Sequence, residues 1–126
     1  MATEKFKIIG KLTAEEQFLI MKRLSSPHIL PFVDMMLQGE KNSILFLPAI
    51  SMALNKMSDE DALMVRNVCL SKVHDISSMP SSAVFRNGVI MNDDLSLSDM
   101  LNFTSEIIMR DMRDFLLTVL PNLAQA

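Results

Sequence analysis

Apolar residues recur at helical spacing in three stretches, and each stretch begins with a hydroxyl residue followed three positions later by an acid. At a helix start, the hydroxyl accepts a hydrogen bond from the third backbone amide, and an acid there can return one. The pairs are Thr13 with Glu16, Ser58 with Asp61, and Ser96 with Asp99. The pattern therefore predicts helices over residues 13–24, 58–73 and 96–120.

Two further apolar stretches precede the second of these helices. Residues 29–37 carry Asp34 as their only charge, which is typical of a helix that is buried all round or faces a partner. Residues 44–57 keep helical spacing, and Pro48 suits a first helical turn. We therefore expect a helix in the second stretch, while the fold of residues 26–48 stays open.

Short β-structure is expected in two places. Asn87-Gly88 separates two β-prone runs, and this pair favours a two-residue hairpin turn in which both residues have positive φ. Residues 1–10 are expected to form a short strand or an extended arm, and the serine-rich residues 74–83 a loop. The sequence thus predicts a mainly α fold: a single small helical domain over residues 1–126, of about four to five helices, with a short β-hairpin near residues 84–91.

The spacing of apolar residues also predicts which side of each helix is buried. In the first helix these residues are Phe18, Met21 and Leu24, with Leu19 and Ile20 beside them on one broad side, and in the second Leu63, Met64, Val68 and Cys69. A rotation of about 100° per residue places one stripe of the last helix against the core. That stripe consists of Leu101, Ile108, Met112, Phe115, Leu116 and Val119.

The first half of the last helix has a second apolar side. Met100, Phe103 and Ile107 lie roughly opposite the core stripe, whereas charged residues take this side in the second half. Such a side indicates either a surface for a partner or contacts with residues 29–37 within the chain.

Methionine is unusually frequent, at 12 of 126 residues. Its flexible side chain forms adaptable binding surfaces, although a loosely specified core would also use it. The candidate partner-binding residues are Met100, Phe103, Ile107, Met35 and Met36.

Composition narrows the class of protein. Lys and Arg total 12 against 15 Asp and Glu, a net charge of −3, and apolar residues make up 49%, enough for one core. No nucleic-acid partner is expected, because the basic cluster is small and the chain has no Trp or Tyr. No membrane segment is expected, because the longest apolar run, residues 44–50, is too short. The lone Cys69 and the lack of a secretory signal pattern indicate an intracellular protein.

Candidate catalytic and metal-binding residues are few. Asp93 and Asp94 resemble turn residues ahead of a helix start more than a calcium loop. A Cys69–His74 nucleophile pair is conceivable, but Cys69 is expected to face the core. No phosphate-binding glycine loop or zinc motif occurs. We therefore expect neither an enzyme, a metal nor a cofactor, and the Cys69–His74 enzyme remains as an alternative.

The order of short motifs resembles the tail assembly chaperones of tailed bacteriophages. Leu-Thr-Ala-Glu at residues 12–15 resembles the family's early helix start, and a similar start follows at residues 57–61. Gly-Val-Ile-Met-Asn-Asp-Asp-Leu at residues 88–95 resembles the family's turn before a long C-terminal helix, which closes here near Phe115. Residues 26–48 match no part of this pattern.

The resemblance implies a predominantly helical protein of the host cytoplasm that is absent from the mature virion. It implies that the chain binds the tape measure protein, keeps it soluble and helps recruit tail tube protein subunits. It also implies a tendency to self-associate, and some members have a longer, frameshifted form. The alternative is a small phage-encoded regulatory or inhibitory protein that acts by protein–protein contact on a host factor.

Overall fold

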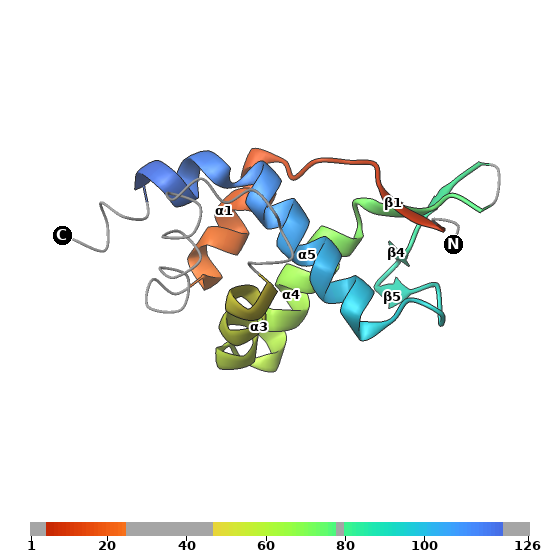
Figure 1. The fold of residues 1–126 in the computed structure, drawn as a ribbon, viewed down its shortest axis with the longest axis horizontal. Helices are drawn as coiled ribbons and strands as arrows, with labels where there is room; N and C mark the ends of the chain where they lie inside the picture. Colours follow the sequence, from red (N-terminus) through yellow and green to blue (C-terminus); the bar gives the residue numbers. More distant parts are fainter. Residues whose placement is uncertain (1–4, 25–46, 78–79, 120–126) are drawn as a thin grey trace.

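The computed structural model describes residues 5–24, 47–77 and 80–119, and this part of the chain is mainly helical. Figure 1 shows α5 running from two small sheets at one end of the molecule, past α4 and α3, toward α1 at the other. The helices are α1 (Ala14–Arg23), α3 (Leu47–Lys56), α4 (Asp59–Leu70) and α5 (Leu97–Asp111), followed by the π-helical turn η2 (Phe115–Val119). The strands are β1 (Phe6–Ile8), β2 (Val73–Asp75), β3 (Ser82–Ala83), β4 (Phe85–Arg86) and β5 (Val89–Ile90).

All three predicted helix starts are confirmed. In α1, the Glu16 amide donates to Thr13 Oγ1 at 3.1 Å, and the Thr13 amide donates to Glu16 Oε1 at 2.8 Å. Ser96 and Asp99 form the same reciprocal pair at the start of α5, and at the start of α4 the Ser58 hydroxyl accepts from the Asp61 amide. The caps satisfy backbone amides that have no partner within the helix, so the sequence determines these starts locally.

Two helix ends differ from the prediction. Helix α4 ends at Leu70 rather than Val73, because Val73 begins strand β2. The regular part of the last helix ends at Asp111, and the chain continues through η2 to Val119. The predicted end at residue 120 lies outside the described residues.

The strand, one of the two structures expected near the N-terminus, is present, and the predicted loop over residues 74–83 is wrong at both ends, where strands β2 and β3 lie. Strands β1, β2 and β3 form an antiparallel sheet with β2 in the middle, in which Ile8 lies opposite Val73 and His74 opposite Ala83. Pairing with two other segments, together with the burial of Val73, overrides the weak strand preference of the serine-rich run.

The predicted hairpin is also confirmed. Strands β4 and β5 pair with Phe85 opposite Ile90, and the turn residues Asn87 and Gly88 have φ angles of 52° and 78°. Positive φ at both positions is the requirement that the Asn-Gly pair predicted. The described part of the chain therefore contains two small sheets rather than one hairpin alone.

Three predicted orientations are wrong. Phe18 and Leu63, expected in the core, are 55% and 46% exposed, whereas Ile20 and Val65, two positions further along the same helices, are fully buried. Leu24 and Cys69, also expected in the core, are buried, so the core side of each helix turns away from Phe18 and Leu63 but keeps part of the expected side. Ile107, expected to face outward, is fully buried.

The burial of Ile107 follows from the position of α5. This helix packs against α4 and also against α3, and Thr104, Ser105 and Ile108 are buried beside Ile107. Because two helices pack on α5, a wider part of its surface is buried than the single stripe that the sequence predicted. At Ile107 and Ile108, α5 is therefore part of the core on both of its apolar sides.

Candidate functional site

The structure separates the residues predicted to contact a partner. Met35 and Met36 lie outside the described residues. Ile107 is in the core, and Met100 and Phe103 are half-buried against it. A partner contact through Met100 and Phe103 stays a prediction, now without Ile107 as an exposed neighbour.

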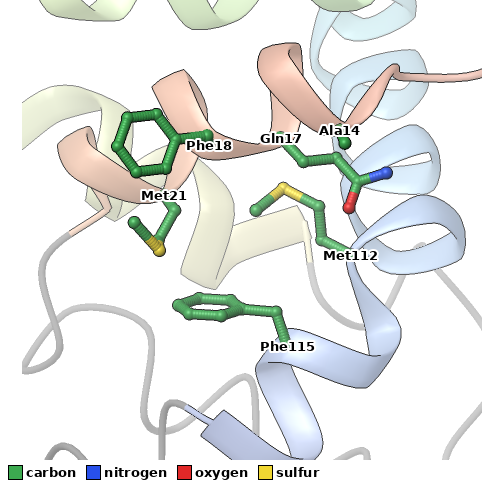
Figure 2. Close-up of a pocket in the computed structure, with 6 residues that line it drawn as sticks. All are labelled: Ala14, Gln17, Phe18, Met21, Met112 and Phe115. Atoms are coloured by element: carbon green, nitrogen blue, oxygen red, sulfur yellow. The ribbon is translucent and has the colours of Figure 1, made fainter.

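An apolar pocket opens instead between α1 and the helical segment that follows α5. It has a volume of about 170 Å³. Figure 2 shows its lining side chains, which carry no formal charge: Ala14, Gln17, Phe18, Met21, Met112 and Phe115. Two aromatic rings and two thioethers thus surround one concave site.

The α1 wall of the pocket is one face of that helix. Ala14, Gln17, Phe18 and Met21 follow the spacing of i, i+3, i+4 and i+7, which brings side chains to the same side. Thr13 and Glu16 fix where the helix begins and therefore which residues face the pocket. Since the core side of α1 is used by Ile20, this second apolar side stays accessible, with Phe18 55% exposed.

The opposite wall forms where α5 changes its hydrogen-bond pattern. Met112 has non-helical angles (φ −111°, ψ 16°), and the chain resumes as the π-helical turn that begins at Phe115. Met112 is buried, while Phe115 is half-buried, and Figure 2 shows Met21 directed toward the Phe115 ring. Single π-helical turns are frequent at functional sites.

Polar contacts hold the two walls together. The Leu12 amide donates to Asp111 Oδ2 at 2.9 Å, and Arg110 Nη2 donates to the Gly10 carbonyl at 2.7 Å. Gln17 Nε2 donates to the Leu12 carbonyl at 3.2 Å. The segment leading into α1 is therefore tied to the end of α5, next to the pocket.

Asp111 is the centre of this arrangement. Burial alone would raise the pKa of Asp111, but hydrogen bonds from Arg110 and from the Leu12 amide lower it overall. Only 6% of its side chain is exposed, and Arg110 Nη2 lies 2.8 Å from Asp111 Oδ2. The carboxylate is thus ionised at neutral pH, when it accepts these hydrogen bonds most strongly.

One cation lies at the edge of the pocket. The Lys22 ammonium is 5.9 Å from the centre of the Phe18 ring, within the range of a cation–π contact. Lys22 is exposed and takes part in none of the salt bridges found within residues 5–24, 47–77 and 80–119. The pocket is therefore apolar inside with one positive charge beside it.

The structure also shows the surroundings of the candidate catalytic residues Cys69, His74 and Asp94. Burial raises the pKa of Cys69 to about 12, with smaller contributions from Asp111 and Glu16, so the thiol is protonated at neutral pH. His74 Nδ1 lies 3.0 Å from Ser81 Oγ. Asp94 accepts from Lys5 at 2.6 Å. A cysteine nucleophile requires the thiolate, so this geometry gives no support to the Cys69–His74 alternative.

Within residues 5–24, 47–77 and 80–119, no group of three or more His, Cys, Asp and Glu side chains is arranged to hold a metal ion. None of the helices in these ranges has the length and apolar character that a membrane crossing requires.

The sequence alone did not identify the pocket. Phe18, Met112 and Phe115 were each assigned to a core face, and Met112 is indeed buried. The signal available was the second apolar spacing in the first helix, at residues 14, 18 and 21. The sequence carries no comparable signal for the π-helical turn. The second wall of the pocket, which depends on that turn, could therefore not be predicted.

Comparison with known proteins gives one match. A family model described as phage tail assembly chaperone protein, TAC, matches residues 4–122 of the 126. The match includes residues 26–48, which the motif resemblance left unplaced. Neither a curated protein nor a solved structure matches the chain.

Proposed function

Because the chain belongs to the phage tail assembly chaperone family, we propose that it binds the tape measure protein of its phage and keeps it soluble. It then helps to recruit tail tube subunits during tail assembly. The family match over residues 4–122 supports the chaperone role, and the motif resemblance suggests these two partners. The binding is non-catalytic and takes place in the host cytoplasm, and the chain leaves before the virion is complete.

The observation that carries a binding role is the apolar pocket between α1 and η2. Exposed apolar surface that is also concave is typical of a protein contact site. An amphipathic helix of the tape measure protein would place its apolar side there, as in other helix-in-groove complexes. Met100 and Phe103, half-buried on α5, are a second predicted contact, and self-association is a further proposed property.

Co-expression with the tape measure protein of the same genome tests this function. The complex would be purified through a tag on the small chain and its mass measured by size-exclusion chromatography with light scattering. We expect the tape measure protein to become soluble and to co-elute. If it stays insoluble and nothing co-elutes with the unaltered chain, the proposed function is wrong.

A matched pair of variants tests the place of binding. Phe18 on α1 and Met52 on α3 are 55% and 56% exposed, so an aspartate at either position should leave the fold intact. We expect Phe18→Asp to abolish co-elution and Met52→Asp to preserve it. Equal loss from both variants would contradict a role for the pocket. Phe103→Asp tests the second predicted contact in the same assay.

A further inference from the structure

We infer that the pocket between α1 and η2 takes a single large apolar side chain, the anchor, from a helix of the tape measure protein. The same helix carries a carboxylate beside the anchor. The inference rests on the proposed function and adds to it the chemistry by which one segment of the partner is selected. It concerns Phe18, Met21, Met112 and Phe115 as the receptor for the anchor, and Lys22 as the partner of the acid.

The size of the pocket sets the size of the anchor. Its volume is about 170 Å³. An apolar protein cavity of ~150 Å³ is large enough to bind benzene. One aromatic ring, or one branched aliphatic side chain, therefore fills the pocket. A helix would lie across its opening and insert one residue, rather than occupy it with several.

The lining favours an apolar anchor, and an aromatic one in particular. Two rings, Phe18 and Phe115, can meet an inserted ring edge to face, and the thioethers of Met21 and Met112 make favourable contacts with aromatic edges. Gln17 is the one polar side chain, and its amide nitrogen already donates to the Leu12 carbonyl. A charged anchor would lose its hydration without gaining an ionic partner inside.

The charge at the edge favours an acid next to the anchor. Lys22 stands one turn beyond Phe18 on α1, with its ammonium 5.9 Å from that ring and without a salt bridge in the described ranges. A residue three or four positions from the anchor on a bound helix lies about one turn away. A carboxylate there would reach Lys22 while the anchor occupies the pocket.

The test uses overlapping peptides of about 20 residues, long enough for several helical turns, that cover the tape measure protein of the same genome. Binding of each labelled peptide to the full chain is measured by fluorescence anisotropy. Alanine substitution along the best binder then identifies its anchor and any acid beside it. We expect a Phe, Trp, Leu or Met anchor whose replacement weakens binding at least about tenfold. A polar anchor would overturn the inference.

Ala14→Phe closes the pocket without removing any core residue, because Ala14 is exposed at the first position of α1. We expect it to weaken peptide binding at least about tenfold. Its control is Ser98→Phe, which adds the same ring to the exposed first turn of α5, at the other end of that helix. If circular dichroism shows that Ala14→Phe unfolds the chain, Phe18→Ala, which removes an exposed wall, replaces it.

Charge reversal tests the acid. We expect Lys22→Glu to weaken binding about fivefold, as for a solvent-exposed ion pair, and a peptide with Lys in place of its acid to restore binding to this variant. Lys7→Glu, at an exposed lysine of β1, should have no effect. Equal effects from both reversals, or the absence of rescue, would overturn the role of Lys22.

The outcomes separate this inference from the proposed function. If the full tape measure protein co-elutes with both the unaltered chain and Ala14→Phe, the chaperone function holds and the pocket inference is wrong. If the peptides fail to bind and Ala14→Phe instead abolishes a dimer seen by light scattering, a second copy of this chain occupies the pocket and the inference is wrong. If nothing co-elutes, both proposals fall together.

Discussion

Helix α5 near Ile107 and the helical segment after Asp111 both carry apolar side chains on more than one side, but the two regions are enclosed to different extents. Near Ile107, α4 and α3 cover the helix, so that Ile107 and Ile108 are fully buried. In the second, Met112 and Phe115 face α1 across a pocket. The difference teaches that the number of neighbouring helices, rather than the apolar content, decides which part of a helix can bind a partner.

The largest expected effect is the loss of a core side chain in the covered part of α5. Ile107→Ala should lower the free energy of unfolding by about 3 kcal/mol, because it removes a fully buried side chain and leaves a cavity. Urea denaturation monitored by circular dichroism measures this change. A loss below about 1 kcal/mol would mean that Ile107 is less enclosed than the structure indicates, and would weaken the contrast between the two regions.

The next effect concerns the contact that joins α1 to the end of α5. Asp111→Ala should cost about 2 kcal/mol at neutral pH, because it leaves the Leu12 amide without its acceptor and removes the carboxylate that Arg110 contacts. Asp111→Asn, which keeps an acceptor oxygen, should cost less.

The pH dependence of that contact follows from the pKa of Asp111, which folding lowers below its ordinary value of 3.8. The stabilising contribution of Asp111 is therefore complete at pH values well above 3.8. It is lost as the pH falls through the lower pKa that Asp111 has in the folded state. The difference in unfolding free energy between the unaltered chain and Asp111→Asn should shrink over that acidic range. A difference that stays constant down to pH 2 would contradict the assignment.

A smaller effect is expected at the start of the pocket's α1 wall. Thr13→Ala removes the hydroxyl that accepts from the Glu16 amide and should cost about 1 kcal/mol of stability. Thr13→Ser keeps a hydroxyl and is the control. Thermal unfolding of both variants measures the cap, and equal stability of the alanine and serine variants would show that the cap contributes little.

The smallest effect on stability is expected inside the pocket itself. Phe18→Ala should change the free energy of unfolding by less than about 1 kcal/mol, because Phe18 is more than half exposed. The same variant should still lose most of its peptide binding. A destabilisation as large as that of Ile107→Ala would show that Phe18 belongs to the core and would remove the contrast.

The elements that the sequence predicted well depend on nearby residues. Thr13 and Glu16 form a reciprocal cap within one turn, and Asn87-Gly88 forms a turn with its immediate neighbours. The family assignment belongs to the same group, because it rested on short motifs at such places and the family model confirms it.

The elements that the sequence did not predict depend on residues that are far apart in the chain. Strand β2 exists because Val73 pairs with Ile8, from the start of the chain. Ile107 is buried because α4 and α3 both pack on α5. The pocket was hard to predict for two reasons. Its walls come from α1 and η2, which are far apart in the sequence, and it needs a π-helical turn that no local motif predicts.

The contacts of Gly10 and Leu12 with Arg110 and Asp111 have one more consequence. Both join backbone groups to side chains outside the pocket, so the spacing of its walls does not depend on which apolar residues line it. Phe18, Met21 and Phe115 can therefore be exchanged for other apolar side chains while the frame keeps its shape. The contacts that set the shape of the pocket are thus separate from the side chains that line it. This allows the binding preference of the pocket to diverge rapidly when a partner protein changes its sequence.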